Sequence, residues 1–296
     1  MRHNRDILWK AVLESVMDDL LRFLFPDADE VFDLDKSIIY LDKELAELHP
    51  EPDRPVDVRF VDKLAKVCRK DGTDEWILIH IEVQDETKAM DRALFGERMF
   101  RYFYRCFDHY RKPVAAIGIF CGPDGKLLPT RYSYEFMGTR LQYDYNTIRI
   151  LDYTDEELSN SSNPFAWVAL IAKRKLKEEG KLDDKLLEGK LAIFRKLHEN
   201  GLFQSRKLQA VLEFLDNYIV FEKPETYRKF DEEIDRITGK QNTMNIFEIG
   251  ADMRAERIRW ELVINLIKGT KFSDEKIASL AGVSVDYVKE EREKLH

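Results

Sequence analysis

The sequence WILIHIEVQDE, Trp76 to Glu86, is an apolar run that carries polar residues at alternate positions and ends in two acidic residues. Residues i, i+2 and i+4 of a strand lie on one face. One face of this stretch is wholly aliphatic: Ile77, Ile79, Ile81 and Val83. The other face begins apolar and ends with three polar residues: His80, Glu82 and Gln84. Because charged groups are seldom fully buried without a partner or a metal, the fold must provide one for Glu82.

A second apolar run lies just upstream and predicts a hairpin. Residues Val58 to Val67 read as a strand, and Asp71-Gly72 is a strong turn signal between the two runs. If the two strands pair across this turn, Asp62 and Glu82 lie at the same end of the hairpin, far from the turn. Their side chains can then converge.

Two converging carboxylates repel each other unless they share a proton or a cation. Mg²⁺ takes oxygen ligands and is typically held by one or two carboxylates together with substrate phosphate. The carbonyl of Val83 is a candidate further ligand, and Gln84 is a candidate to orient the attacking water. The alternative is that both carboxylates are solvated or salt-bridged, as acids near strand ends usually are. His80 reads as a core histidine rather than as a ligand.

Periodicity predicts the remaining elements of an α/β module. We expect a helix at Ile7–Phe25 ended by Pro26, a short extended segment at Asp33–Tyr40, a helix at Leu41–Leu48, a long helix at Met90–Tyr110, an interior strand at Val114–Cys121, and a strand pair, Tyr132–Phe136 with Thr147–Leu151, that extends the sheet. This order predicts a mixed sheet flanked by helices.

From Asn163 onward nearly every segment reads as helix. The expected helices are 165–177, 184–199, 207–220, 225–237, 256–267 and 274–295. We therefore predict an α/β domain at 1–155 and an all-helical C-terminal region at 156–296. Within the latter, residues 268–296 resemble a helix-turn-helix, with Ser273 and Ser284 as helix caps around an Ala281-Gly282-Val283 turn. The second helix is acidic, so a packing or protein-contact role competes with DNA reading.

Composition limits the classes of function. The chain has 296 residues, 48 basic against 56 acidic, for a net charge of −8, which disfavours a DNA-coating protein but not a DNA-cleaving enzyme with local basic stripes. Three cysteines without CxxC spacing read as buried thiols rather than as a disulfide framework or zinc site. With no apolar run of membrane-spanning length and no signal-type N-terminus, we expect a soluble, cytoplasmic protein with no membrane partner.

Five ordered segments carry a family resemblance. They are LDKELAEL (41–48), RFVDKLAKV (59–67), WILIHIEVQ (76–84), ERMFRYFYR (97–105) and KPVAAIGIF (112–120), continued loosely by LLPTRYSYEF (127–136) and TIRILDY (147–153). Asp62 with Glu82-Val83-Gln84 resembles the D…(D/E)xK signature of the PD-(D/E)XK nuclease superfamily, with glutamine in the lysine slot. The wider set resembles its recombination-promoting nuclease (Rpn) branch, also labelled putative transposase.

The resemblance implies a restriction-endonuclease-like fold and a bacterial, metal-dependent DNA endonuclease associated with recombination or mobile elements. Asp62 and Glu82 would bind Mg²⁺, with Mn²⁺ or Ca²⁺ as alternatives, and Gln84 would be the third motif residue. The superfamily often adds an acid from a preceding helix, for which Glu44 is our candidate, with Glu47 and Glu14 behind it. A lysine adds positive charge that glutamine lacks, so the reaction would be slower or more dependent on the metal.

Arg98, Arg101 and Arg105 recur at helical spacing after the hairpin. They are candidate DNA phosphate contacts, and the alternative is a solvated face paired with nearby acids. The aromatic residues of the same helix read as core. A homodimer would suit double-strand cutting, which needs two sites. Two rivals stand beside the nuclease: a catalytically inactive nuclease-fold module that binds DNA or protein, and a regulatory protein whose helix-turn-helix carries the function.

Overall fold

The computed structural model describes residues 2–41, 61–71, 76–84, 89–122, 129–178, 183–199, 206–239, 263–264, 266–267, 270 and 272–293. Side chains are described for fewer of these residues, and positions 61–62, 76–84 and 89–93 are given by their backbone alone. The chain is a mixed α/β protein that divides into two compact units, Met1–Ile234 and Asp235–His296.

A five-stranded mixed sheet forms the centre of the first unit, in the order β1-β2-β3-β4-β7. The strands are β1 (Ile39–Tyr40), β2 (Val61–Cys68), β3 (Trp76–Gln84), β4 (Val114–Phe120) and β7 (Asn146–Arg149). The pairs β1–β2 and β2–β3 are antiparallel, whereas β3–β4 and β4–β7 are parallel. The predicted hairpin is confirmed, and β3 has the bounds that the sequence predicts.

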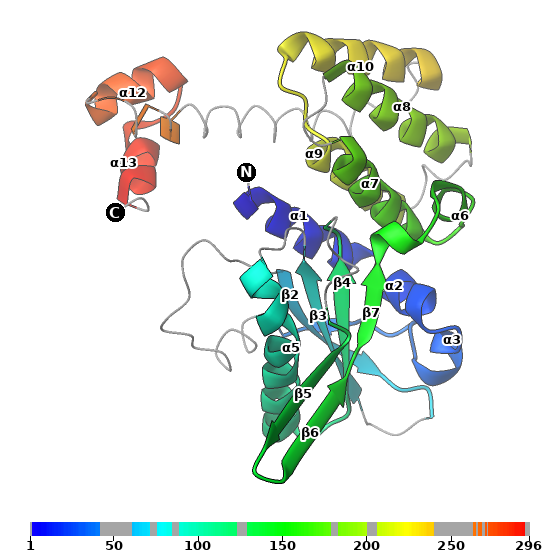
Figure 1. Cartoon of the computed structure of the whole chain (residues 1–296). Coiled ribbons are helices and arrows are strands. Elements are labelled where there is room, and N and C mark those ends of the chain that lie inside the picture. The colour runs from blue at the N-terminus through cyan, green and yellow to red at the C-terminus, as the bar shows by residue number, and fades with distance from the viewer. Residues whose placement is uncertain are drawn as a thin grey trace. The chain divides into compact units, whose positions relative to one another are not determined.

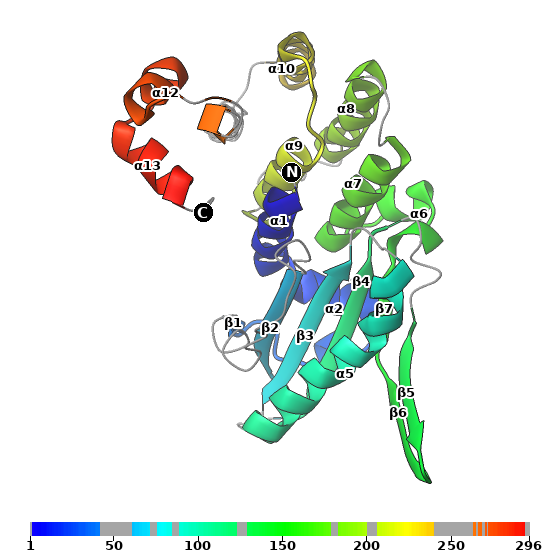
Figure 2. The ribbon, with the colours of Figure 1, turned by 60° about the vertical axis from the view of Figure 1, so that its left-hand side comes forward.

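Helix α5 (Ala89–Tyr110) covers one face of the sheet (Figure 2). It is a helix of 22 residues because its buried side chains recur at spacings of three and four: Phe95, Met99, Tyr102 and Cys106. Beneath it, Leu64 of β2 packs with Cys106. The prediction of a core role is wrong for two aromatic residues of this helix, because Tyr104 and Phe107 are 54% and 43% exposed.

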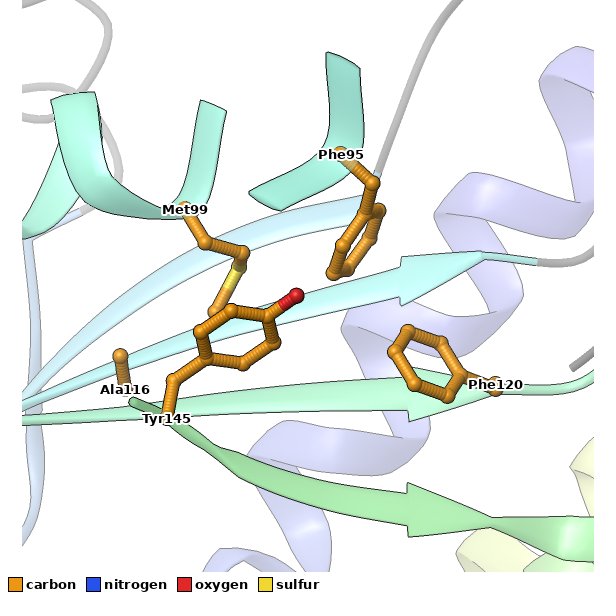
Figure 3. Packing of buried hydrophobic residues seen from close by; sticks show 5 residues of the cluster. All are labelled: Phe95, Met99, Ala116, Phe120 and Tyr145. Carbon is orange, nitrogen blue, oxygen red and sulfur yellow. The ribbon is translucent and has the colours of Figure 1, made fainter. Parts of the chain in front are cut away.

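The packing between α5 and the sheet is aromatic at one end. Phe95 and Met99 of α5, Ala116 and Phe120 of β4, and Tyr145 form one buried cluster (Figure 3). The Tyr145 hydroxyl donates to the carbonyl of Pro129, which satisfies the polar end of that side chain. This cluster fixes α5 over the end of β4.

The other face of the sheet is covered from the N-terminus by two helices, not by the single predicted one. They are α1 (Arg2–Ser15) and α2 (Met17–Leu24), separated at Val16, whose backbone has φ −125° and ψ 25°. The apolar periodicity continues through this break, so the sequence pattern alone does not reveal it. As predicted, the helical run ends before Pro26. A short helix α3 (Ala28–Val31) follows.

The predicted strand at Tyr132–Phe136 forms, but the prediction that it extends the main sheet is wrong. β5 (Arg131–Phe136) pairs with β6 (Thr139–Asp144), a strand that the sequence analysis missed, in a separate two-stranded hairpin that projects from the sheet (Figures 1 and 2). The turn uses Met137 and Gly138, both with positive φ, of 46° and 85°. Only β7 adds to the main sheet, and it is shorter than predicted.

Helices complete the first unit after a short 3₁₀ turn at Ile150–Asp152. The first, α6 (Asp155–Ser159), was not predicted. The next four lie close to the predicted ranges: α7 (Pro164–Glu178), α8 (Asp183–Glu199), α9 (Arg206–Tyr218) and α10 (Pro224–Thr238). They pack onto the N-terminal helices, since Trp9 meets Phe214 edge-on at 5.2 Å between centroids. The Lys207 amine also bonds a carboxylate oxygen of Asp19 at 2.9 Å.

The second unit contains two further described helices, α12 (Asp274–Ala281) and α13 (Val285–Glu293). The predicted caps are present, since the Ser273 hydroxyl accepts from the Lys276 amide and the Ser284 hydroxyl accepts from the Tyr287 amide. Gly282 ends α12 in the left-handed conformation, at φ 66°. The prediction of a single helix at 274–295 is therefore wrong, and the alternative prediction of two helices is correct. DNA reading by this pair stays a prediction.

Candidate active site

The strand register places Asp62 directly opposite Glu82. In an antiparallel pair, opposed residues lie on one face with Cβ atoms about 4.5–5.5 Å apart. The predicted meeting of these two positions at the open end of the hairpin is therefore confirmed at the level of the backbone. The ligand roles assigned to them stay predictions.

The other two predicted motif residues follow on β3. Gln84, the last residue of the strand, shares the face of Glu82 by alternation and is paired with Phe120 of β4. Val83 lies between Val61 and Ile119, in register with both neighbouring strands. A carbonyl inside a ladder is normally committed to a neighbouring strand, so Val83 is the ligand that the register supports least.

The row that contains the two carboxylates continues across the sheet. Glu82 is paired with Gly118, and Gly118 with Thr147. A Cβ atom built on Gly118 would lie 3.3 Å from the rings of both Phe95 and Phe120. The position beside Glu82 is thus occupied by aromatic rings that only a glycine admits without rearrangement.

Of the three candidates for a third acidic ligand, the structure describes only Glu14. Glu44 and Glu47 lie outside the described residues. Glu14, on α1, accepts a hydrogen bond from the Lys63 amine at 2.5 Å. Lys63 is fully buried, and because it follows Asp62 in the strand, it lies on the opposite face of the sheet. Glu14 is thereby engaged on the far side of β2 from the two paired carboxylates.

The three arginines of the predicted stripe differ in their surroundings. Arg101 is exposed and pairs with Glu97 at 2.6 Å on the same helix, which is the solvated arrangement. Arg98 is partly buried, and its guanidinium carbon lies 5.3 Å from the centroid of the Phe95 ring. Arg105 is also partly buried on α5. Phe95 connects Arg98 to the row containing Glu82, because its ring lies 3.3 Å from the Cβ position of Gly118.

Arg149 was missed by the sequence analysis. It is the last residue of β7, is paired with Phe120, and has its guanidinium carbon 5.8 Å from the centroid of that ring. Its sequence context carries no usable signal, because an isolated arginine at a strand end is common. Only the register places it on the same row as Gln84.

The described cysteines are free, as Cys68, Cys106 and Cys121 form no disulfide. Cys106 and Cys121 are buried as predicted, whereas Cys68 is only partly so. Burial raises the pKa of the Cys106 thiol to about 11, so it stays protonated at neutral pH and is a poor nucleophile. The Cys106 thiol therefore serves packing.

The chemistry of the paired positions fits a hard divalent cation, since both side chains supply carboxylate oxygen. Among the side chains that the structure describes, no group of three or more His, Cys, Asp or Glu residues forms an alternative metal site. Comparison with family models, with curated proteins and with solved structures gave no match. Over the described residues, no helix combines the length and apolar character needed to cross a membrane.

Proposed function

We propose that the chain is a metal-dependent DNA endonuclease of the PD-(D/E)XK type, with a restriction-endonuclease-like core built on the five-stranded sheet. The observation that carries the proposal is the Asp62–Glu82 pair in register across the β2–β3 hairpin, with Gln84 two residues further on. A mixed sheet with helices on both faces supports the core assignment. The resemblance of five ordered segments to the Rpn branch supports the same conclusion.

In this proposal Asp62 and Glu82 hold Mg²⁺ through their carboxylates. When bound, the ion stabilises negative charge on the phosphodiester and lowers the pKa of a bound water. Gln84 orients that water by hydrogen bonding. Glutamine brings no positive charge, so charge complementary to the substrate must come from elsewhere on the chain.

The test is nicking of supercoiled plasmid in Mg²⁺ or Mn²⁺, with titration of Mn²⁺ binding by calorimetry as a second readout. We expect Asp62→Asn and Glu82→Gln to lose cleavage at least about 100-fold and to weaken Mn²⁺ binding. The matched control is Asp184→Asn, a carboxylate on α8 whose side chain is 81% exposed. Equal nicking by wild type and Asp62→Asn would exclude this mechanism.

The rival proposal, a nuclease-fold module that binds without cutting, gives a different result. It predicts DNA binding that persists without metal and ignores Glu82→Gln. The acidic composition, with net charge −8, is the feature that favours it. The same titration and a binding assay in EDTA therefore separate the two.

A further inference from the structure

An aromatic pair lies at the end of β4 next to the candidate active site. Phe95 of α5 and Phe120 of β4 meet edge-on, with centroids 5.0 Å apart and an interplanar angle of 72°. Figure 3 shows the Phe95 ring directed from the helix toward the strand that carries Phe120. Both side chains are buried, so the pair is a fixed platform.

An arginine lies over each ring of this pair. The Arg98 guanidinium lies over Phe95 and the Arg149 guanidinium over Phe120, at 5.3 Å and 5.8 Å from the respective centroids. Both residues are partly buried. Cation–π contact restrains the guanidinium, and the planar fork of N–H donors has the geometry that matches a carboxylate or a phosphate.

The register relates this platform to the proposed catalytic residues. Gln84, Phe120 and Arg149 follow one another across three adjacent strands. Two interstrand spacings separate Gln84 from Arg149 in the sheet, which is roughly 10 Å between their backbones. The row formed by Gln84, Phe120 and Arg149 is therefore the next row on this face of the sheet after the one that contains Asp62 and Glu82.

Gly118 explains why the platform can lie so close. It is the β4 neighbour of Glu82, and a side chain there would press on both rings. The aromatic pair therefore fills the space above the position adjoining Glu82, and it holds the arginines at the border of the site.

We propose that Arg98 and Arg149 form a two-arginine clamp on the DNA phosphate next to the one being cleaved. The inference rests on the proposed nuclease function and adds Arg149 to its residues. An acidic chain that places two carboxylates against a polyanion needs local positive charge to bind it. Arginine supplies that charge with bidentate, charge-assisted hydrogen bonds, and no chemical step is assigned to either residue. Both arginines are substrate-binding residues in this proposal.

The test measures binding of a short DNA duplex by fluorescence anisotropy in Ca²⁺, between about 50 and 200 mM salt. We expect Arg98→Gln and Arg149→Gln each to weaken binding roughly tenfold and to reduce the slope of log K against log salt by about 0.9, the value for one lost phosphate contact. The charge-matched control is Arg228→Gln on α10, whose side chain is 74% exposed. It should leave affinity and slope unchanged.

Arg149→Lys provides a second variant that retains the charge. We expect it to keep most of the salt slope but to lose plasmid nicking several-fold, because lysine lacks the planar fork. If Arg149→Gln fails to fold, as judged by thermal melting, Arg149→Lys decides the question. Plasmid nicking by Arg149→Lys at the wild-type rate would overturn the clamp. Unchanged affinity and slope in a folded Arg149→Gln would also overturn it.

Failure of the clamp is distinguishable from failure of the nuclease. If wild type nicks in an Asp62-dependent manner but Arg149→Gln binds normally, only the clamp is wrong. If wild type does not nick but the salt slope falls in Arg149→Gln, the nuclease is wrong and the arginine contact stands. Absence of any DNA binding by wild type would overturn both.

Discussion

Lys190 is a fully buried cation that the described structure satisfies with three hydrogen bonds. Its amine donates to the Asp216 carboxylate at 2.7 Å and to the carbonyls of Asp216 and Ile219 at 2.9 and 3.1 Å. It also lies over the rings of Phe221 and Phe230. This single side chain therefore joins α8 to the end of α9 and to α10.

Substitution of Lys190 tests that role. We expect Lys190→Ala to lower the free energy of unfolding by about 3–5 kcal/mol, because the buried Asp216 carboxylate loses its ion pair with the lysine. Urea denaturation followed by circular dichroism measures the loss. Lys229→Ala is the control, because Lys229 is 62% exposed and its amine makes a long, solvated ion pair with Asp184, at 4.0 Å. This substitution should lower the free energy of unfolding by about 0–1 kcal/mol. Equal losses in the two variants would contradict the assignment.

Asp183 begins α8 and binds the start of α10. Its carboxylate accepts from the amides of Glu222 and Lys223 at 3.0 and 2.8 Å and from the Thr226 hydroxyl at 3.0 Å. Burial alone would raise the pKa of Asp183, but these donors outweigh it and hold that pKa below its ordinary value of 3.8.

A depressed pKa gives a defined dependence of stability on pH. The stabilisation from ionised Asp183 is fully present above pH 3.8 and is lost as the pH falls through the lower pKa of the folded state. We expect Asp183→Asn to be less stable than wild type at neutral pH by roughly 1–3 kcal/mol, with a smaller difference in strong acid. Unfolding curves at several pH values measure this. A difference independent of pH would refute the linkage, and Asp184→Asn is the exposed control.

At the scale of elements, α5 and the β5–β6 hairpin approach each other through a glycine. A Cβ atom on Gly96 would lie 3.0 Å from the backbone carbonyl oxygen of Arg131. Next to this contact, Phe100 of α5 stacks on Tyr132 of β5 with centroids 5.4 Å apart. The projecting hairpin is thus fixed at its base by a close backbone approach and an aromatic stack.

We expect Gly96→Ala to displace the base of the hairpin. Alanine gains about 1 kcal/mol of helix propensity, but overpacking against a backbone atom costs about 1–3 kcal/mol. The net effect on global stability should be small, and the local effect is diagnostic. In Gly96→Ala, amide hydrogen exchange should be faster than in wild type over 131–144 and unchanged in β4. Exchange at the wild-type rate in both segments would show that the hairpin does not depend on Gly96.

The elements that the sequence predicted share strong local signals. The β2–β3 hairpin follows from alternation on both sides of Asp71-Gly72, and α5 from its apolar face. β6 was missed because its turn relies on a left-handed Met137, a conformation that methionine seldom signals. The Asp62–Glu82 pairing was predictable from the hairpin, whereas Arg149 and the buried Lys63 were not, since tertiary contacts alone define their surroundings.

At the scale of the whole molecule, the α/β part and the following helices form one compact unit that ends at Ile234. Trp9 of α1 packs on Phe214 and Tyr218 of α9, and Phe23 of α2 packs on Phe165 of α7. The predicted boundary at 155/156 divides the chain between the partners of these contacts. The domain boundary at 155/156 stays a prediction, and these side-chain contacts cross it.

Truncation tests the extent of this unit. We expect residues 1–239 to unfold in one sharp thermal transition, and residues 1–155 alone to show none, because Trp9 and Phe23 lose the side chains that bury them. Calorimetry or circular dichroism measures both. A cooperative transition in residues 1–155 would show that the helical region is dispensable for folding.

Phe214→Ala in the full chain should lower the free energy of unfolding by about 3–5 kcal/mol.

The adjacent residues Asp62 and Lys63 also favour the observed register of β2. A slip of β2 by one residue would turn Lys63 to the opposite face of the sheet, away from Glu14 and the Tyr40 ring, and would turn Asp62 to the face that Lys63 now occupies. Such a slip would therefore cost stability at two adjacent residues. The observed register, which pairs Asp62 with Glu82, is the one that keeps the Lys63 contacts.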